Sequence, residues 1–174
     1  RNALLKAAQS QFVQEDQFET WEEPMAESAA AIRLYRNNFV NELSPKAIEV
    51  HQALALKEKI EIRYESKDCL MDGYEIATAL ARDRSTDVFR GTTSLGPHRD
   101  DLVIAIDDQD ARKFGSQGQQ RTAIIALKFA TLELAKERLG VPPILLLDDI
   151  LSDLDEGRRE RLVEWIVQAV GQAV

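Results

Sequence analysis

Two neighbouring carboxylates, Asp148 and Asp149, directly follow four aliphatic residues at 144–147, and Pro142 and Pro143 introduce that run. The run predicts a strand buried on both faces, most readily within a parallel sheet. Open α/β sheets bind ligands at the carboxyl ends of their strands, where these two acids would stand. Such a pair suits a Mg²⁺-nucleotide site, because one carboxylate can reach the hydrated metal and the other can orient an attacking water. On the strand alone, an acidic surface turn is an equally good explanation.

A second motif, Gly-Ser-Gln-Gly-Gln-Gln-Arg-Thr at 115–122, opens a predicted long helix. The amino-terminal end of a helix presents backbone N–H groups and a positive dipole end to an anion, and small residues let a phosphate approach. Ser116 adds a hydroxyl donor. A serine cap after a glycine turn is the commoner explanation of such a motif. Against it stands Arg121, since a cation in the first turn opposes the helix dipole and asks for a carboxylate or phosphate partner.

The elements that must position these motifs can be read from periodicity. Alternating apolar residues indicate strands, and apolar residues three and four apart indicate helices. Gly140 should end the long helix, and Asp72 with Gly73 should begin an earlier one. The predicted elements are strands at 59–65 and 102–106, and helices at 74–84, at 119–139 and from about residue 156.

The first 57 residues or so have a helical pattern without a catalytic constellation. One helix is expected from Leu4 to Trp21, with Pro24 as a break or the first turn of another helix. Ser44 and Pro45 would cap and start a further helix. Between these prolines lies an apolar stripe that we expect to be buried, at Ile32, Tyr35, Phe39 and Leu43.

Three motifs together resemble ABC-type ATPases. Residues 116–121 resemble their signature motif, 144–149 their Walker B strand, and 152–155, Ser-Asp-Leu-Asp, their D-loop. Residues 96–101, Gly-Pro-His-Arg-Asp-Asp, form a fourth motif. Together the four motifs are similar in sequence to the RecF family of bacterial recombinational repair proteins, in the RecF/SMC group. The resemblance is close over about 90–165 and looser before it, and the motifs occur in the right order at the right distances.

The resemblance implies a role for each matching residue. Asp148 would bind Mg²⁺ and Asp149 would orient the attacking water. Ser152 and Asp155 would lie at a dimer seam, and the 116–121 motif would contact the γ-phosphate of ATP held by a second subunit. The nucleotide-binding residues implied in this way are Ser116, Gln117, Gly118, Gln119, Arg121, Ser152 and Asp155.

This sequence departs from the ABC pattern at three points. Most ABC ATPases carry Glu at the position of Asp149, and the shorter side chain fits slow hydrolysis. Gln117 replaces the first of the usual signature glycines. No G-x-x-x-x-G-K-[ST] phosphate loop occurs in the 174 residues. In RecF-like proteins that loop lies in an amino-terminal half, so we expect a carboxyl-terminal fragment that is inactive alone.

The fold class implied is α/β, a partial ABC-type ATPase head. We expect a mostly helical arm at 1–90 and the carboxyl-terminal lobe of the head at 91–174. The full-length protein would form an ATP-dependent homodimer on gapped DNA or single-/double-strand junctions and assist recombinase loading with RecO- and RecR-like proteins. ATP and Mg²⁺ are the implied cofactors, hydrolysis would be slow and DNA-stimulated, and the role would lie in repair, recombination, replication and the SOS response.

Composition narrows the class of protein further. The chain has 174 residues, 44% of them hydrophobic, which fits one domain or a domain with an appendage. Cys69 is its single cysteine, and no apolar run approaches a bilayer span, so a cytoplasmic location is expected. With 30 acidic against 22 basic residues, the net charge of -8 opposes wholesale binding of nucleic acid.

Several basic residues are weaker candidates. Arg33, Arg36 and Lys46 could form a DNA-facing patch, and His98 with Arg99 could meet DNA or nucleotide, but solvated surfaces are the better explanation. A lone His51 suggests no metal site. Two other readings of the whole chain stay open: a head of the chromosome-maintenance type, which lacks support because no heptad run persists, and a non-catalytic interaction domain.

Overall fold

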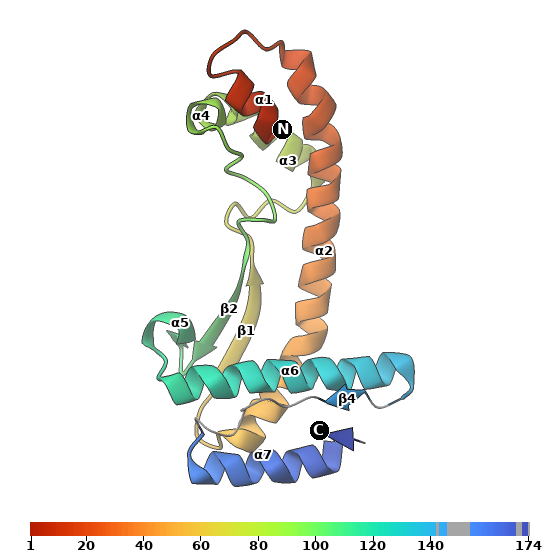
Figure 1. Cartoon of the computed structure of the whole chain (residues 1–174), viewed down its shortest axis with the longest axis vertical. Helices are drawn as coiled ribbons and strands as arrows, with labels where there is room; N and C mark the ends of the chain where they lie inside the picture. The colour runs from red at the N-terminus through yellow and green to blue at the C-terminus, as the bar shows by residue number, and fades with distance from the viewer. Residues whose placement is uncertain (142, 146–153, 170–171, 174) are drawn as a thin grey trace. The chain divides into compact units, whose positions relative to one another are not determined.

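A computed structural model shows a mixed helical and sheet protein (Figure 1). The residues that it describes are 1–141, 143–145, 154–169 and 172–173. They fall into two compact units. Unit 1 comprises Arg1–Asn38 and Tyr64–Leu102, and unit 2 comprises Phe39–Arg63 and Val103–Val174. Because both units draw on residues from each side of position 90, the expected arm at 1–90 and lobe at 91–174 remain predictions.

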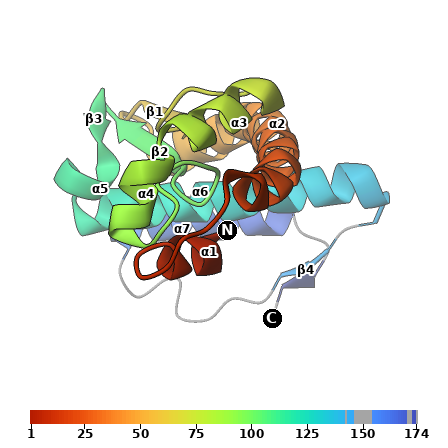
Figure 2. The same ribbon diagram turned by 90° about the horizontal axis from the view of Figure 1, so that it is seen from above.

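Unit 1 contains α1 (Asn2–Ala7), the first part of α2 (Glu15–Leu54), α3 (Gly73–Arg82) and α4 (Arg84–Arg90). Figure 2 shows the short helices α1 and α4 next to each other. Asp72 caps α3 by accepting hydrogen bonds from two first-turn backbone N–H groups, as its sequence predicts. The core of unit 1 joins α2, α3 and the loop that follows α4 through Ala26, Ala29, Ile76, Ala79, Leu80 and Leu95.

The expected breaks in the first 57 residues are wrong in position. The chain leaves α1 after Ala7, and α2 then continues for 40 residues through both Pro24 and Pro45. Both prolines lie on the exposed side of α2, where water can bond to the carbonyl groups that they leave without a partner. Ser44 is no helix cap, since its hydroxyl donates to the Ile62 carbonyl oxygen at 3.3 Å. Packing of one continuous face therefore outweighs the local helix-breaking tendency.

The predicted apolar stripe of α2 is also mostly wrong. Ile32, Tyr35 and Phe39 are 40%, 75% and 39% exposed, and of the four predicted residues Leu43 alone is buried. The buried face is rotated from the predicted one because its centre is an ion cluster around Arg33, described below. Apart from His51, which is buried next to Val50, the buried positions recur three, four or seven residues apart: Phe18, Glu22, Ala26, Ala29, Arg33, Val40, Leu43, Ala47, Val50 and Leu54.

The sheet consists of β1 (Ile60–Glu65), β2 (Asp101–Ile106) and β3 (Gln109–Asp110), in that order. β2 and β3 form an antiparallel hairpin in which Ile106 pairs with Gln109. The two turn residues between them, at 107 and 108, both have positive φ, the geometry of a two-residue hairpin turn that aspartate tolerates. The strands predicted at 59–65 and 102–106 are thus confirmed.

Unit 2 is built on α6 (Gln117–Leu139) and α7 (Glu156–Ala169), which pack with the end of α2. Gly140 ends α6 in the left-handed conformation, as predicted. On α6 the Ile125 side chain faces the core of unit 2, whereas that of its neighbour Ile124 is 51% exposed. The buried cluster comprises Val50, Leu54, Ile125, Ala126, Phe129, Leu154 and Leu162.

The strand expected at 144–147 is described only for β4 (Ile144–Leu145). It pairs in parallel with β5 (Gln172–Ala173), which follows α7, so the parallel direction is confirmed. Burial on both faces is not, because Ile144 is 65% exposed. In the described part of the chain, β4 has β5 as its strand neighbour, and no second layer covers the Ile144 side chain.

Candidate functional site at the start of α6

A sharp corner leads into the predicted phosphate-facing motif. The short helix α5 (Ala111–Phe114) ends at Gly115, whose N–H donates to the Ala111 carbonyl oxygen at 3.1 Å. A Cβ atom on Gly115 would lie 2.5 Å from that same oxygen, so a glycine is required. The Gln120 side chain fastens the corner by donating to the carbonyl oxygens of Ala111 at 2.9 Å and Gly115 at 3.0 Å. The motif therefore starts from a fixed backbone position.

Ser116 is the amino-terminal cap of α6. Its Oγ accepts a hydrogen bond from the Gln119 backbone N–H, and the Gln119 side chain accepts one from the Ser116 N–H, which completes a capping box. The cap explanation that the sequence favoured is thus observed. It does not exclude a ligand, because the Ser116 and Gln117 side chains are both exposed at the helix end.

Nothing among the described residues requires a glycine at position 118. A Cβ atom built on it would meet nothing within 4 Å, and its backbone is helical. Glycine destabilises a helix relative to alanine by about 0.5–1 kcal/mol, so this position gives up stability for no gain in the packing of α6. The contrast with Gly115 is direct: one glycine is required by its own corner, and the other leaves an open approach to the first turn.

Arg158, in the first turn of α7, reaches across to the first turn of α6. Its Nη1 donates to the Gly118 carbonyl oxygen at 3.1 Å and to Thr122 Oγ1 at 2.7 Å. Its Nη2 donates to Glu58 at 2.7 Å, and its Nε lies 3.1 Å from Asp155 Oδ2. An arginine in the first turn of a helix opposes the helix dipole, so a neighbouring acid is expected to balance its charge. That holds for Asp155, but the bonds to α6 and to Glu58 were missed because periodicity carries no information about long-range polar contacts.

Asp155 has a clear local role. Its carboxylate accepts a hydrogen bond from the Arg158 backbone N–H at 2.9 Å, so it caps the start of α7. The side chain is 65% exposed. Through Arg158, the structure thus joins two of the regions that the sequence singled out, the 116–121 motif and the end of the 152–155 motif. Arg121 is half-buried on the same turn of α6, and its predicted role stays a prediction.

A partly unsatisfied polar group lies behind Arg158. His51, near the end of α2, is fully buried, and Glu58 Oε2 is 3.8 Å from its Nε2 atom. Neither His51 ring nitrogen has a hydrogen-bond partner among the described residues, nor does Glu58 Oε2. Burial lowers the pKa of His51, and the positive charge of Arg158 lowers it further against the opposing effect of Glu58. His51 is therefore neutral near pH 7.

Three of the predicted site residues, Asp148, Asp149 and Ser152, lie outside the described residues, so their predicted roles remain untested. Among the described residues, no cluster of three or more His, Cys, Asp or Glu side chains could hold a metal ion. None of the helices described here is long and apolar enough to cross a membrane.

The assignment of Arg33 to a solvated face is wrong. Arg33 is fully buried in unit 1, where it forms bidentate pairs with Asp68 and Asp100 and donates to the Leu70 carbonyl oxygen. Burial by itself lowers the pKa of Arg33, but the bonds to the two carboxylates outweigh it and raise that pKa overall. Tyr64 also donates to Asp100. The acidic end of the 96–101 motif thus has a structural function.

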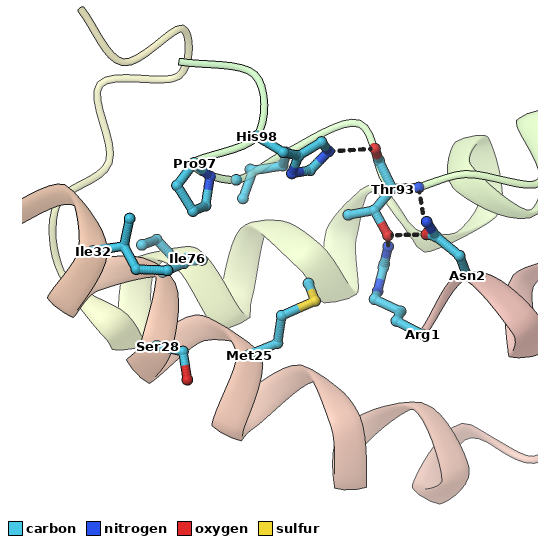
Figure 3. Close-up of a pocket in the computed structure, with 12 residues that line it drawn as sticks. Arg1, Asn2, Met25, Ser28, Ile32, Ile76, Thr93, Pro97 and His98 are labelled. Carbon is cyan, nitrogen blue, oxygen red and sulfur yellow. Dashed lines mark hydrogen bonds between the residues drawn. The ribbon is translucent and has the colours of Figure 1, made fainter. Parts of the chain in front are cut away.

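Three other weak candidates, Arg36, Lys46 and His98, also have partners. Arg36 donates to the Pro97 carbonyl oxygen, and Lys46 pairs with Glu137. Figure 3 shows a mainly apolar pocket of unit 1, about 490 Å³ in volume, whose lining includes Met25, Ile32 and His98. The His98 ring is hydrogen-bonded to the Thr93 carbonyl oxygen at 3.1 Å. None of the predicted nucleotide-binding residues lines this pocket.

Comparisons with known proteins identify close relatives of the whole chain. No protein-family model matches it. The DNA replication and repair protein RecF of Alkaliphilus oremlandii is 38% identical over 171 residues, which cover 94% of this chain and 46% of that protein. RecF of Symbiobacterium thermophilum is 39% identical over 179 residues, which cover 98% of the chain and 47% of that relative. The chain thus spans about half the length of the curated relatives it matches.

Solved structures agree with this result. A structure of the recombination mediator protein RecF with ATP, in the RecFOR pathway, superposes with a TM-score of 0.85 at 31% identity and covers 99% of this chain and 48% of that one. A second, with ATPγS, gives a TM-score of 0.83 at 32% identity over the same shares of both chains. The predicted fold class, an α/β piece of an ABC-type ATPase head with a helical part, is confirmed.

Proposed function

Because the chain is homologous to RecF proteins over nearly its whole length, as its motifs indicated, we propose that it carries the edge of an ABC-type ATPase that grips the ATP of a second subunit. The full-length protein then acts in DNA repair and recombination. This proposal is supported by relatives described as DNA replication and repair proteins and by similar structures that contain ATP or ATPγS. The matches favour this reading over a chromosome-maintenance head or a non-catalytic interaction domain.

The observation that carries the proposal is the open first turn of α6. Its backbone N–H groups and the positive end of its dipole suit a phosphate, and Gly118 leaves space for one to approach. The capping box keeps the Ser116 hydroxyl at the exposed end of the helix, and Gly115 and Gln120 fix the corner behind it. These residues fit the γ-phosphate of ATP, with Gln117, Gln119 and Arg121 beside them on the same turn.

The remaining site residues are assigned by the same proposal. Asp148 holds Mg²⁺, and Asp149 orients the attacking water, with a shorter reach than the usual glutamate and therefore slow turnover. Ser152 and Asp155 lie at the seam between two subunits. Bound ATP supplies a phosphoanhydride bond whose hydrolysis releases the grip, so that ATP acts as a conformational timer. The 174 residues alone are inactive, because they lack a phosphate loop.

Partners follow from the same assignment. The full-length protein forms an ATP-dependent homodimer in the cytoplasm on gapped DNA or on single-/double-strand junctions, and it assists recombinase loading with RecO- and RecR-like proteins. With a net charge of -8, this part of the protein contributes little general attraction for DNA, so any DNA contact it makes must be local.

The test is nucleotide-driven dimerisation of the full-length protein. Sedimentation velocity with and without a non-hydrolysable ATP analogue measures the dimer fraction for wild type, Ser116→Arg and Ser116→Ala. Arginine places a long side chain where the phosphate must sit, so Ser116→Arg should still bind nucleotide as a monomer but should not dimerise. Ser116→Ala loses the cap, at about 0.5–2 kcal/mol of stability, but keeps the edge open and should largely retain dimerisation.

The two variants distinguish a phosphate-binding role of Ser116 from its role as a helix cap. If Ser116→Arg dimerised with nucleotide like wild type, the phosphate-facing assignment would fail. Equal loss in both variants, in proportion to their loss of thermal stability, would show that Ser116 acts only as a cap.

A further inference from the structure

We infer that Arg158 is a positioning residue that fixes the phosphate-gripping turn of α6, and that its pair with Glu58 ties this turn to the end of α2. The inference rests on the proposed function of that turn. None of the family motifs includes Arg158 or Glu58, and periodicity gave no sign of their contact.

The contacts of Arg158 act on the backbone that presents the candidate site. Its Nη1 bonds to the Gly118 carbonyl oxygen, so it holds the peptide group that follows the open glycine. It also bonds to Thr122 Oγ1, and the Thr122 hydroxyl donates in turn to the same Gly118 oxygen at 2.7 Å. Guanidinium donors have fixed directions within one plane, so this arrangement restricts rotation as well as position.

Electrostatics alone do not explain why an arginine stands here. Arg158 lies in the first turn of α7 and beside the first turn of α6, and both helix ends repel a cation. Two carboxylates, Asp155 and Glu58, compensate its charge. Because its charge is compensated, Arg158 adds little net attraction for an anion. Its role is to orient the backbone of the first turn of α6.

Glu58 provides the connection to α2. It lies four residues beyond the last residue of α2, with one oxygen on Arg158 and the other facing the buried His51 of that helix. Arg161, one turn further along α7, donates to the Leu54 carbonyl oxygen at the very end of α2. A displacement of this corner therefore reaches α6 through the Glu58–Arg158 pair, while Arg161 holds α7 to α2 without contacting α6 in any bond described here.

Arg161 supplies a matched control for Arg158. Both arginines are half-buried on α7, and both bond to the segment around the end of α2, but the bonds to α6 come from Arg158. In full-length protein, Arg158→Met should weaken dimerisation driven by a non-hydrolysable ATP analogue on the order of tenfold to a hundredfold, since hydrogen bonds of a charged group are lost. Arg161→Met should dimerise like wild type at a comparable loss of thermal stability. Nucleotide binding by the monomer should be unchanged in both.

Two milder variants test the same positioning role if Arg158→Met folds poorly. Thr122→Val removes one acceptor of Arg158 at constant shape and should weaken dimerisation less than Arg158→Met does. Combined with Arg158→Met it should add nothing, because both changes break the same link. Glu58→Gln keeps an acceptor for Arg158 but loses the charge, and an intermediate effect is expected.

The outcomes distinguish this inference from the function on which it rests. If wild type fails to dimerise with nucleotide, the proposed function and the positioning role fall together. If wild type dimerises and Arg158→Met does so equally well, or no worse than Arg161→Met, the positioning role alone is overturned. Additive effects of Thr122→Val and Arg158→Met would also overturn it.

Discussion

Two arginines of this chain, the buried Arg33 of unit 1 and the half-buried Arg158 of unit 2, are held in different ways. In unit 1, Arg33 is fully buried, and its donors meet two aspartates and a backbone carbonyl group. In unit 2, Arg158 is 17% exposed and divides its donors among α6, α7 and Glu58. Behind Arg158, three polar atoms of His51 and Glu58 are buried without a hydrogen-bond partner in the described part of the chain.

This difference indicates that the Arg33 cluster is purely structural, whereas the Arg158 cluster can exchange hydrogen-bond partners. The Arg33 cluster is satisfied within unit 1, so moving any member leaves a buried charge uncompensated. The Arg158 cluster has spare acceptors and donors beside it, so partners can be exchanged at lower cost. A basic residue beside a family motif is therefore not by itself a ligand-binding residue: Arg33 stabilises the fold, whereas Arg158 touches the candidate site.

The largest expected effect is on Arg33. Arg33→Met should lower the free energy of unfolding by about 3–5 kcal/mol, because Asp68 and Asp100 would stay buried without their partner. Chemical denaturation monitored by circular dichroism measures this change. Arg82→Met is the control, since Arg82 pairs with Asp83 on the surface and its removal should leave the unfolding free energy nearly unchanged. A small effect of Arg33→Met would contradict the contrast between the two clusters.

A smaller effect, on pH dependence, is expected at His51. Its folded-state pKa is lowered from 6.5 by burial and by Arg158, against Glu58 and Asp107. As the pH falls below 6.5, the unfolded chain takes up the proton first, so wild type loses stability by at most about 1.4 kcal/mol per pH unit for this group. His51→Leu should flatten that loss between pH 7 and the folded-state pKa.

His98 serves as the matched control for this measurement, because it is the other histidine of the chain and its side chain is exposed. Comparison of His51→Leu with His98→Gln separates removal of the buried histidine from removal of an exposed one. If His51→Leu and wild type lost stability equally on acidification, His51 would not be the buried neutral group described here. The polar groups around Arg158 would then be as fully partnered as those around Arg33.

The smallest expected effect on the fold is a gain. Gly118→Ala should raise the free energy of unfolding by up to about 0.5–1 kcal/mol, because the methyl group meets no neighbour and the helix gains propensity. It should nevertheless weaken nucleotide-driven dimerisation of the full-length protein. Gly73→Ala, in the first turn of α3 with only ordinary contacts around a new Cβ, should leave dimerisation unchanged. Unchanged dimerisation in both would remove the reason given for a glycine at 118.

Much of the fold follows from sequence pattern. The strands at 59–65 and 102–106, the Asp72 cap and the end of α6 at Gly140 were predicted because local rules decide them. The course of α2 was not, since packing along a continuous buried face overrides two prolines. The buried face of α2 was misplaced for a related reason: a pattern of apolar residues cannot show that Arg33 is the residue at the centre.

The residues of the candidate site could be proposed from the sequence, but the contacts that hold them in place could not. The 115–122 motif carried its own evidence in glycines, a serine and an arginine. The pair at 148 and 149 suggested a Mg²⁺-nucleotide site by its residues alone, and the family resemblance assigned one role to each acid. Arg158 had no such signal, because its partners at 58, 118 and 122 are 36 or more residues away in the chain. A first-turn arginine that opposes its own helix dipole was the one available hint.

The central claim is that the start of α6 completes the ATP site of another subunit. Mixing two inactive full-length variants tests it most directly. Ser116→Arg damages the gripping edge, and Asp149→Asn damages the water-orienting position of the other half-site. In a mixed dimer, one of the two shared sites then receives intact residues from both subunits.

ATP hydrolysis should therefore be absent or very low for each variant alone and should partly return when the two are mixed, in proportion to the mixed dimer present. The same mixture should show the return only at concentrations at which dimers form. If the mixed sample stays as inactive as its components while mixed dimers are present, the two residues act within a single subunit, and the start of α6 does not face the ATP of a partner.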